Sequence, residues 1–187
     1  MAYFFFDFKD TGKQNARSFL SSILVQLSNR AVSFCDILLE FFSAHQRDSQ
    51  QPGDRELMQC LEKMLRFPRK EPIYVIIDAL DECPDPSSSG LRSTREKVLE
   101  LVQTLVGFHL PNLRLCVTSR LEIDIRNVLE PLTPAKNRIS LHDQGGQKKD
   151  IADYVCSVVY SDRKMMSWRE KDKALVIKTL LEKAGGM

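Results

Sequence analysis

The chain has 187 residues, the length of one ordinary domain with room for the start of a second. Its composition, 43% hydrophobic and 28% charged, is typical of a soluble globular protein. The 27 basic and 25 acidic residues leave a net charge of +2, which gives no electrostatic basis for binding nucleic acid or an anionic membrane. No apolar run approaches the roughly 20 residues that cross a bilayer, and the first residues lack the features of a signal peptide.

The five cysteines are far apart, odd in number and form no C-x-x-C pair. Without a secretion signal, such cysteines are expected to be reduced thiols, so we expect a cytoplasmic protein. The three histidines show no spacing typical of a metal site.

The N-terminal part begins with a short aromatic segment at residues 3–8, which predicts a buried strand. The polar residues 9–13 predict a turn. Apolar residues then recur at helical spacing in two stretches, from 16 to 27 and from 34 to 42. These two stretches therefore predict two consecutive helices, each with one buried face.

A third helix is expected over residues 57–65. The Pro52-Gly53 pair predicts a loop before it, Asp54 is a good N-cap residue, and Pro68 ends the helical pattern.

The central segment of the chain is the apolar run at 73–77, which ends at Asp78 and is followed by Asp81 and Glu82. The unbroken run predicts a strand buried on both faces, as in a parallel sheet. Ligands of open α/β sheets bind outside the carboxyl ends of the strands. Crowded carboxylates favour a nearby cation, and Mg²⁺ is held by one or two carboxylates together with phosphate oxygens. The alternative is an acidic, solvated turn, which one acid alone would not distinguish from a site.

Residues 83–94, with two prolines, three consecutive serines and a glycine, predict a mobile loop. A helix follows from about Arg95, and then a strand at 113–117 that ends at the triplet T-S-R. A short helix is expected over 122–129, which stops before Pro131.

The last part of the chain predicts a final strand at 138–141 and a break at Gly145-Gly146. Two helices are expected after it, one carrying the apolar residues of 151–159 and one from about 170 to 184. Strands that alternate with helices in this order predict an α/β fold with a mostly parallel sheet.

Two segments carry a resemblance to a known family. Y-V-I-I-D-A-L-D-E-C, at 74–83, resembles the Walker B element of the NACHT branch of P-loop NTPases, which belongs to the signal-transduction ATPases with numerous domains (STAND). L-C-V-T-S-R, at 115–120, resembles the strand and arginine called sensor 1. The opening aromatic strand with F-K-D-T-G-K-Q, at 3–14, and the segment at 139–155 resemble the same group, and in particular fungal proteins with a nephrocystin-type N-terminal P-loop domain. The resemblance implies an incomplete P-loop NTPase three-layer sandwich followed by C-terminal helices.

The resemblance also implies roles for individual residues. Asp78 would hold Mg²⁺ through water, and Asp81 or Glu82 would orient the attacking water. Arg120, preceded by Ser119, would contact the γ-phosphate of ATP or GTP and report its loss. Such roles suit phosphoryl transfer, which depends on positioning and on charge stabilisation. The plainer interpretation of Arg120 is a surface arginine at the end of a strand.

The phosphate-binding loop of that family, G-x-x-x-x-G-K-[ST], is missing. The only Gly-Lys pair is Gly12-Lys13, but Asp7 stands where the first glycine belongs and Gln14 where a hydroxyl residue would reach the metal. We therefore interpret Gly12-Lys13 as a turn, and residues 1–146 as a partial NTPase domain that precedes the start of a helical domain at 147–187.

In the family, the P-loop strand lies between the sensor strand and the last strand. Its loss predicts an unpaired strand edge, which favours self-association or pairing with full-length relatives. The chain also resembles a middle piece, cut before and after. We therefore expect a fragment of a NACHT-type nucleotide-dependent switch that does not bind or hydrolyse ATP competently alone. The alternatives are an interaction module that uses the sheet edge, and an active NTPase whose P-loop lies in upstream sequence.

Overall fold

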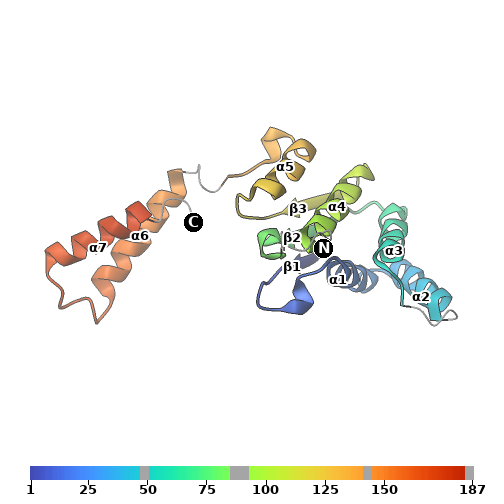
Figure 1. Ribbon diagram of the computed structural model, residues 1–187, viewed down its shortest axis with the longest axis horizontal. Helices are drawn as coiled ribbons and strands as arrows, with labels where there is room; N and C mark the ends of the chain where they lie inside the picture. The colour runs from blue at the N-terminus through green and yellow to red at the C-terminus, as the bar shows by residue number, and fades with distance from the viewer. Residues whose placement is uncertain (47–50, 85–92, 141–144, 184–187) are drawn as a thin grey trace. The chain divides into compact units, whose positions relative to one another are not determined.

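The computed structural model describes residues 1–46, 51–84, 93–140 and 145–183 (Figure 1). The chain divides into two compact units, Met1–Thr133 and Pro134–Met187. The predicted loop at 83–94 lies mostly outside the described residues, as does the end of the last predicted helix.

The first unit contains a sheet of three parallel strands in the order β1-β2-β3. The strands are β1 (Ala2–Phe5), β2 (Ile73–Asp78) and β3 (Leu113–Val117). Parallel neighbours need crossover connections, and here these contain helices, so the α/β class with a parallel sheet is confirmed.

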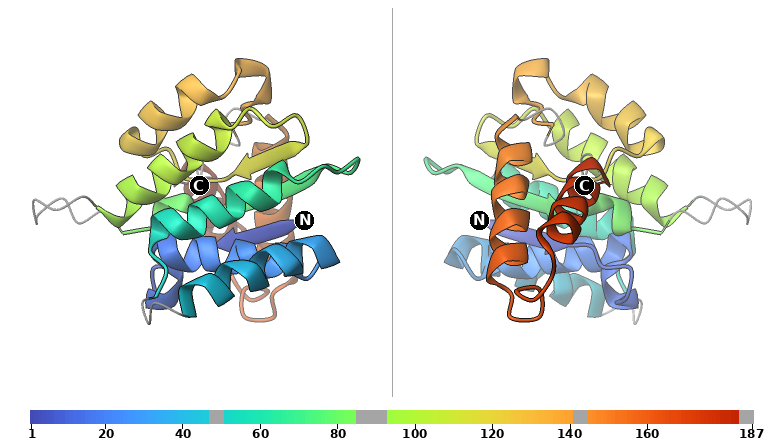
Figure 2. Two further views of the ribbon diagram at one scale, coloured as in Figure 1. Left: turned by 90° about the vertical axis from the view of Figure 1, so that its right-hand side faces the viewer. Right: turned by 90° about the vertical axis from the view of Figure 1, so that its left-hand side faces the viewer.

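The helices of this unit pack mainly over one face of the sheet. In Figures 1 and 2, α1 and α4 lie next to the strands, and α2 and α3 pack on α1 on the side away from the sheet. Helix α5 packs on α4. The bounds are α1 (Ala16–Ser28), α2 (Val32–Gln46), α3 (Asp54–Arg66), α4 (Thr94–Gly107) and α5 (Ile123–Leu132).

Aromatic and aliphatic side chains fill the space between the sheet and α1. The ring of Phe4 contacts Phe6 edge to face, with centroids 4.9 Å apart, and Phe19 of α1, with centroids 5.7 Å apart. Val75 and Ile77 of β2 are buried in the same core. The alternation of the strands therefore directs one set of side chains into this core and fixes their register.

The opposite face of the sheet differs from the prediction. The run at 73–77 was expected to be buried on both faces, but Tyr74 is 49% exposed. An apolar run is equally compatible with a strand that has one covered face, so its composition alone could not separate the two cases. On this face the exposed side chains are Tyr3, Phe5, Tyr74, Arg114 and Cys116.

Two helix ends also differ from the prediction. The N-cap of α3 is Gly53 rather than Asp54, because the side chain of Glu56 reaches back to accept a hydrogen bond from the Gly53 amide at 2.7 Å. Helix α5 continues through Pro131, which lies in its last turn, where a proline removes a single intrahelical bond.

The second unit contains two long helices, α6 (Gly145–Ser161) and α7 (Glu170–Lys183), which pack against each other. The strand predicted at 138–141 is wrong for its described part, because residues 138–140 form no strand. A strand needs a neighbour to pair with, and Ile139 is exposed. The break expected at Gly145-Gly146 is also wrong. These glycines begin α6, where the first amides have no intrahelical partner to lose.

None of the helices in the described part of the chain is both long and apolar enough to cross a membrane.

Candidate functional site

The candidate site begins where β2 ends. Asp78 is the last residue of the strand, and Ala79 turns the chain sharply with a φ of 53°, in the left-handed region that non-glycine residues rarely adopt. A short 3-10 helix, η2 (Leu80–Glu82), follows directly. The strained turn places three acidic side chains at the carboxyl edge of the sheet, where ligands of such sheets bind.

Thr118, the residue after β3, holds this turn from the neighbouring strand. Its hydroxyl donates a hydrogen bond to Asp78 Oδ1 and accepts one from the Ala79 amide at 3.1 Å. Its carbonyl oxygen accepts a bond from the Leu80 amide, also at 3.1 Å. The relay from amide to hydroxyl to carboxylate fixes the orientation of Asp78, and neither of its interactions was anticipated from the sequence.

Asp81 and Arg120 form a second link between the same two strand ends. The Arg120 amide donates to Asp81 Oδ1 at 2.9 Å, and the Arg120 guanidinium Nε lies 3.4 Å from Asp81 Oδ2. The side chain of Asp81 is only 10% exposed, whereas that of Arg120 is 82% exposed. The carboxylate is therefore committed to holding the loop after β3, while most of the guanidinium faces solvent.

The other two predicted site residues have local partners. The carboxylate of Glu82 accepts a hydrogen bond from the Phe8 amide at 3.2 Å, which joins the turn after β2 to the turn after β1. The Ser119 hydroxyl donates to the carbonyl oxygen of Arg120 at 2.8 Å. The structure thus brings Asp78, Asp81, Glu82 and Arg120 to one edge, and it directs the Ser119 hydroxyl to the backbone.

Arg95, in the first turn of α4, was missed as part of this arrangement. Its guanidinium donates to the carbonyl oxygens of Asp81 and Cys83, at 2.7 and 2.9 Å, and pairs with Asp124 of α5 at 3.2 Å. The side chain is 12% exposed. In the sequence it is an ordinary arginine after a helix start, and only the fold shows that it anchors the acidic turn.

The Gly12-Lys13 pair lies in a short 3-10 helix, η1 (Thr11–Lys13). The Gly12 amide donates to Asp10 Oδ1 at 3.0 Å, and the Lys13 ammonium pairs with Asp10 Oδ2 at 3.4 Å. The Lys13 amide also donates to the carbonyl oxygen of Asp10, at 2.8 Å, so the segment folds on Asp10 as a tight turn and the interpretation as a turn is confirmed.

The donor set at the edge fits a bound Mg²⁺ nucleotide only in part. Asp78 could serve as a carboxylate ligand alongside phosphate oxygens, and Arg120 offers exposed N–H donors. Asp81 and Glu82, however, already accept backbone hydrogen bonds. Among the described residues there is no group of three or more His, Cys, Asp and Glu side chains that could hold a metal ion.

The fold and this edge define an α/β protein with a parallel sheet. The end of one strand carries acidic residues, and one of them pairs with an arginine that follows the next strand. The sequence model of the family described as "Nephrocystin 3, N-terminal" matches residues 1–120, which include every residue of the edge. The chain therefore belongs to this family. Searches of curated proteins and of solved structures gave no match.

Proposed function

We propose that the first unit derives from a nucleotide-dependent signalling switch of the NACHT type, acting in the cytoplasm, and that it retains one half of the nucleotide pocket. The observation that carries the proposal is the double link between the ends of β2 and β3, Asp78 to Thr118 and Asp81 to Arg120. An ordinary solvated turn would not need two acids from one strand end bound to the residues after the next strand.

In this proposal the edge would serve Mg²⁺ and ATP or GTP. Asp78, oriented by Thr118, would accept the metal through water, and the exposed guanidinium of Arg120 would face the terminal phosphate. Asp81 would act as a positioning residue, because its oxygens are engaged by Arg120. Glu82 would orient water only after releasing the Phe8 amide.

The proposal also holds that this chain alone does not bind nucleotide competently. The affinity of P-loop proteins depends on backbone amides that cradle the phosphates. In the Gly12-Lys13 turn, the Gly12 amide donates a hydrogen bond to Asp10, and the Lys13 ammonium forms an ion pair with the same carboxylate. A metal ligand and one arginine at the rim leave the phosphates mostly solvated, so affinity should be low.

Isothermal titration with Mg²⁺-ATP and Mg²⁺-GTP tests this. We expect no saturable binding below about 1 mM, which corresponds to about −4 kcal/mol. Micromolar binding that is abolished in Asp78→Ala and Arg120→Ala, but kept in a surface control, Arg126→Ala, would overturn the proposal of an incompetent half-site. Micromolar binding that all three variants retain would overturn the assignment of the edge itself.

A second candidate function, an interaction module, is favoured by the two edges of the sheet. The outer edge of β1 is covered: Gln26 accepts from the Tyr3 amide at 3.0 Å and donates to its carbonyl oxygen at 2.7 Å. In the described part of the chain no strand pairs with the outer edge of β3. The amide and the carbonyl oxygen of Thr118 both form hydrogen bonds to the β2 side. Because successive residues of a strand point their peptide groups to opposite sides, those of Leu115 and Val117 face the outer edge of β3.

This candidate predicts association with a second copy or with a longer relative through β3. Helix α5 lies beyond β3 in Figure 1, so an added strand would enter beside it. Light scattering should show dimers whose fraction rises with concentration. Gln26→Leu, which uncovers the edge of β1, should increase association further. A monomer at all concentrations in both proteins would rule out the module.

A further inference from the structure

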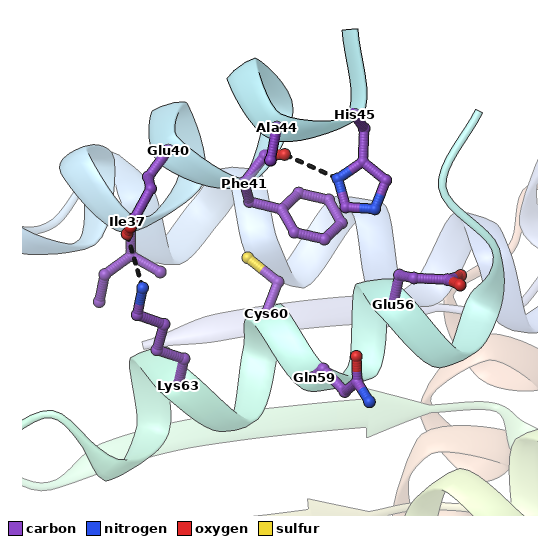
Figure 3. A pocket seen from close by; sticks show the side chains of 9 residues that line it. All are labelled: Ile37, Glu40, Phe41, Ala44, His45, Glu56, Gln59, Cys60 and Lys63. Atoms are coloured by element: carbon purple, nitrogen blue, oxygen red, sulfur yellow. Dashed lines mark hydrogen bonds and ion pairs between the residues drawn. The ribbon is translucent and has the colours of Figure 1, made fainter. Parts of the chain in front are cut away.

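A cavity of about 340 Å³ lies between α2 and α3, on elements that contribute nothing to the acidic edge (Figure 3). Its volume is at the lower end of the range for sites that bind small molecules. Residues from facing sides of the two helices line it, and they differ in character from one end to the other.

The middle of the cavity is apolar. The ring of Phe41, from α2, and the Cys60 thiol, from the facing side of α3, lie there, and Ile37 extends the apolar wall toward the end where Glu40 and Lys63 lie (Figure 3). Burial raises the pKa of the Cys60 thiol to about 11, although the positive charge of Lys63 partly opposes the shift. The thiol is therefore protonated at neutral pH, and the wall it forms is apolar and unreactive.

One end of the cavity offers hydrogen-bond acceptors. The Nδ1 of His45 lies 2.8 Å from the carbonyl oxygen of Phe41, which can only accept, so Nδ1 carries a proton and, in this tautomer of the ring, Nε2 is the acceptor. Glu56 uses Oε2 to accept from the Gly53 amide, which leaves its Oε1. Gln59 adds a side-chain amide. This end suits a ligand group that donates hydrogen bonds.

The charges of the lining are not balanced. At the other end, Glu40 and Lys63 form an ion pair with an N–O distance of 2.6 Å, so their charges cancel locally. Among the residues that the structure describes, no lysine or arginine pairs with Glu56, and its carboxylate gives the acceptor end a negative charge. A ligand with a positive group at one end and an apolar body would match both features.

We propose that this cavity binds a small arylalkyl primary amine. The aromatic ring would pack between Phe41, Ile37 and the Cys60 thiol, because rings and sulfur make favourable contacts. The ammonium group would donate to Glu56 Oε1 and His45 Nε2. The site is separate from the acidic edge, so the proposal does not depend on nucleotide binding.

The test compares three probes of one shape, 2-phenylethylamine, 2-phenylethanol and 3-phenylpropionate, by chemical-shift titration of the full chain in ¹H–¹⁵N spectra. We expect the amine to bind at least about tenfold more tightly than the alcohol, and the carboxylate not to bind. Shifts should centre on residues of α2 and α3.

Three variants make the test specific. Ala44→Trp should fill the cavity and abolish binding of both the amine and the alcohol. Glu56→Gln keeps an acceptor for the Gly53 amide, so α3 should remain capped, but affinity for the amine should fall about tenfold while affinity for the alcohol is unchanged. Glu62→Gln, on α3 outside the cavity, is the matched control.

Equal affinity for all three probes would mean that the cavity binds apolar rings without recognising the amine, and it would overturn the proposal. So would the absence of shifts at about 10 mM amine, or binding that Ala44→Trp leaves intact.

Discussion

Two turns of this protein follow neighbouring parallel strands, at the same edge of one sheet, and both are acidic. The end of β2 and the turn that follows it contain Asp78, Asp81 and Glu82, and the turn after β1 contains Asp7 and Asp10. The acids of the first turn bind residues far away in the sequence, including Thr118 and Arg120. The acids of the second bind amides two residues further on, those of Lys9 and Gly12.

The difference is between bonds that join two strand ends and bonds that close a turn within itself. Asx-type bonds within a few residues stabilise a turn of almost any protein and need no ligand. Bonds that join two strand ends through buried or oriented carboxylates restrict the positions of both loops. Such an arrangement holds polar groups in a fixed geometry at the edge, which a phosphate-binding site requires.

Replacing Asp81 should have the largest effect on stability, and it tests the contrast between the two turns. In Asp81→Ala the Arg120 amide and guanidinium lose a nearly buried carboxylate, and hydrogen bonds to charged groups contribute more than neutral ones. We expect the free energy of unfolding to fall by about 2 kcal/mol, measured by urea denaturation followed by circular dichroism.

Two controls accompany this variant. Asp81→Asn keeps an oxygen acceptor for the Arg120 amide and should lose about half as much. Glu62→Ala removes an exposed i,i+4 pair with Arg66 and should cost less than about 0.5 kcal/mol. If Asp81→Ala proved as mild as Glu62→Ala, the link between the strand ends would not stabilise the edge.

Much of the first unit could be predicted from local patterns. The strand at 73–77, the strand at 113–117 and the helical spacing of α1 are confirmed, because their apolar periodicity reflects burial in one core. What failed depended on neighbours distant in the sequence. Whether residues 138–140 pair, and whether Tyr74 is covered, are decided by other elements, and composition does not encode them.

The candidate site, too, could be predicted from the sequence only in part. The order of acids after one strand and an arginine after the next was sufficient to expect Asp78 and Arg120 at one edge, since parallel strands end on the same side. The engagement of Asp81 by Arg120, and the anchoring of the turn by Arg95, depend on side-chain distances that spacing cannot supply. The predicted catalytic roles of Asp81 and Glu82 remain predictions.

The smallest expected effect on the free energy of unfolding comes from the turn after β1. Asp10→Ala removes the acceptor of the Gly12 amide and an ion pair with Lys13 whose two side chains are about half exposed. We expect a loss of about 0.5–1 kcal/mol, typical of a cap residue, and almost none in Asp10→Asn, because asparagine caps equally well. The same urea titrations measure both variants. A loss as large as that of Asp81→Ala would mean that local bonds restrain this edge as strongly as the bonds between strands, and the contrast between the two turns would no longer identify the site.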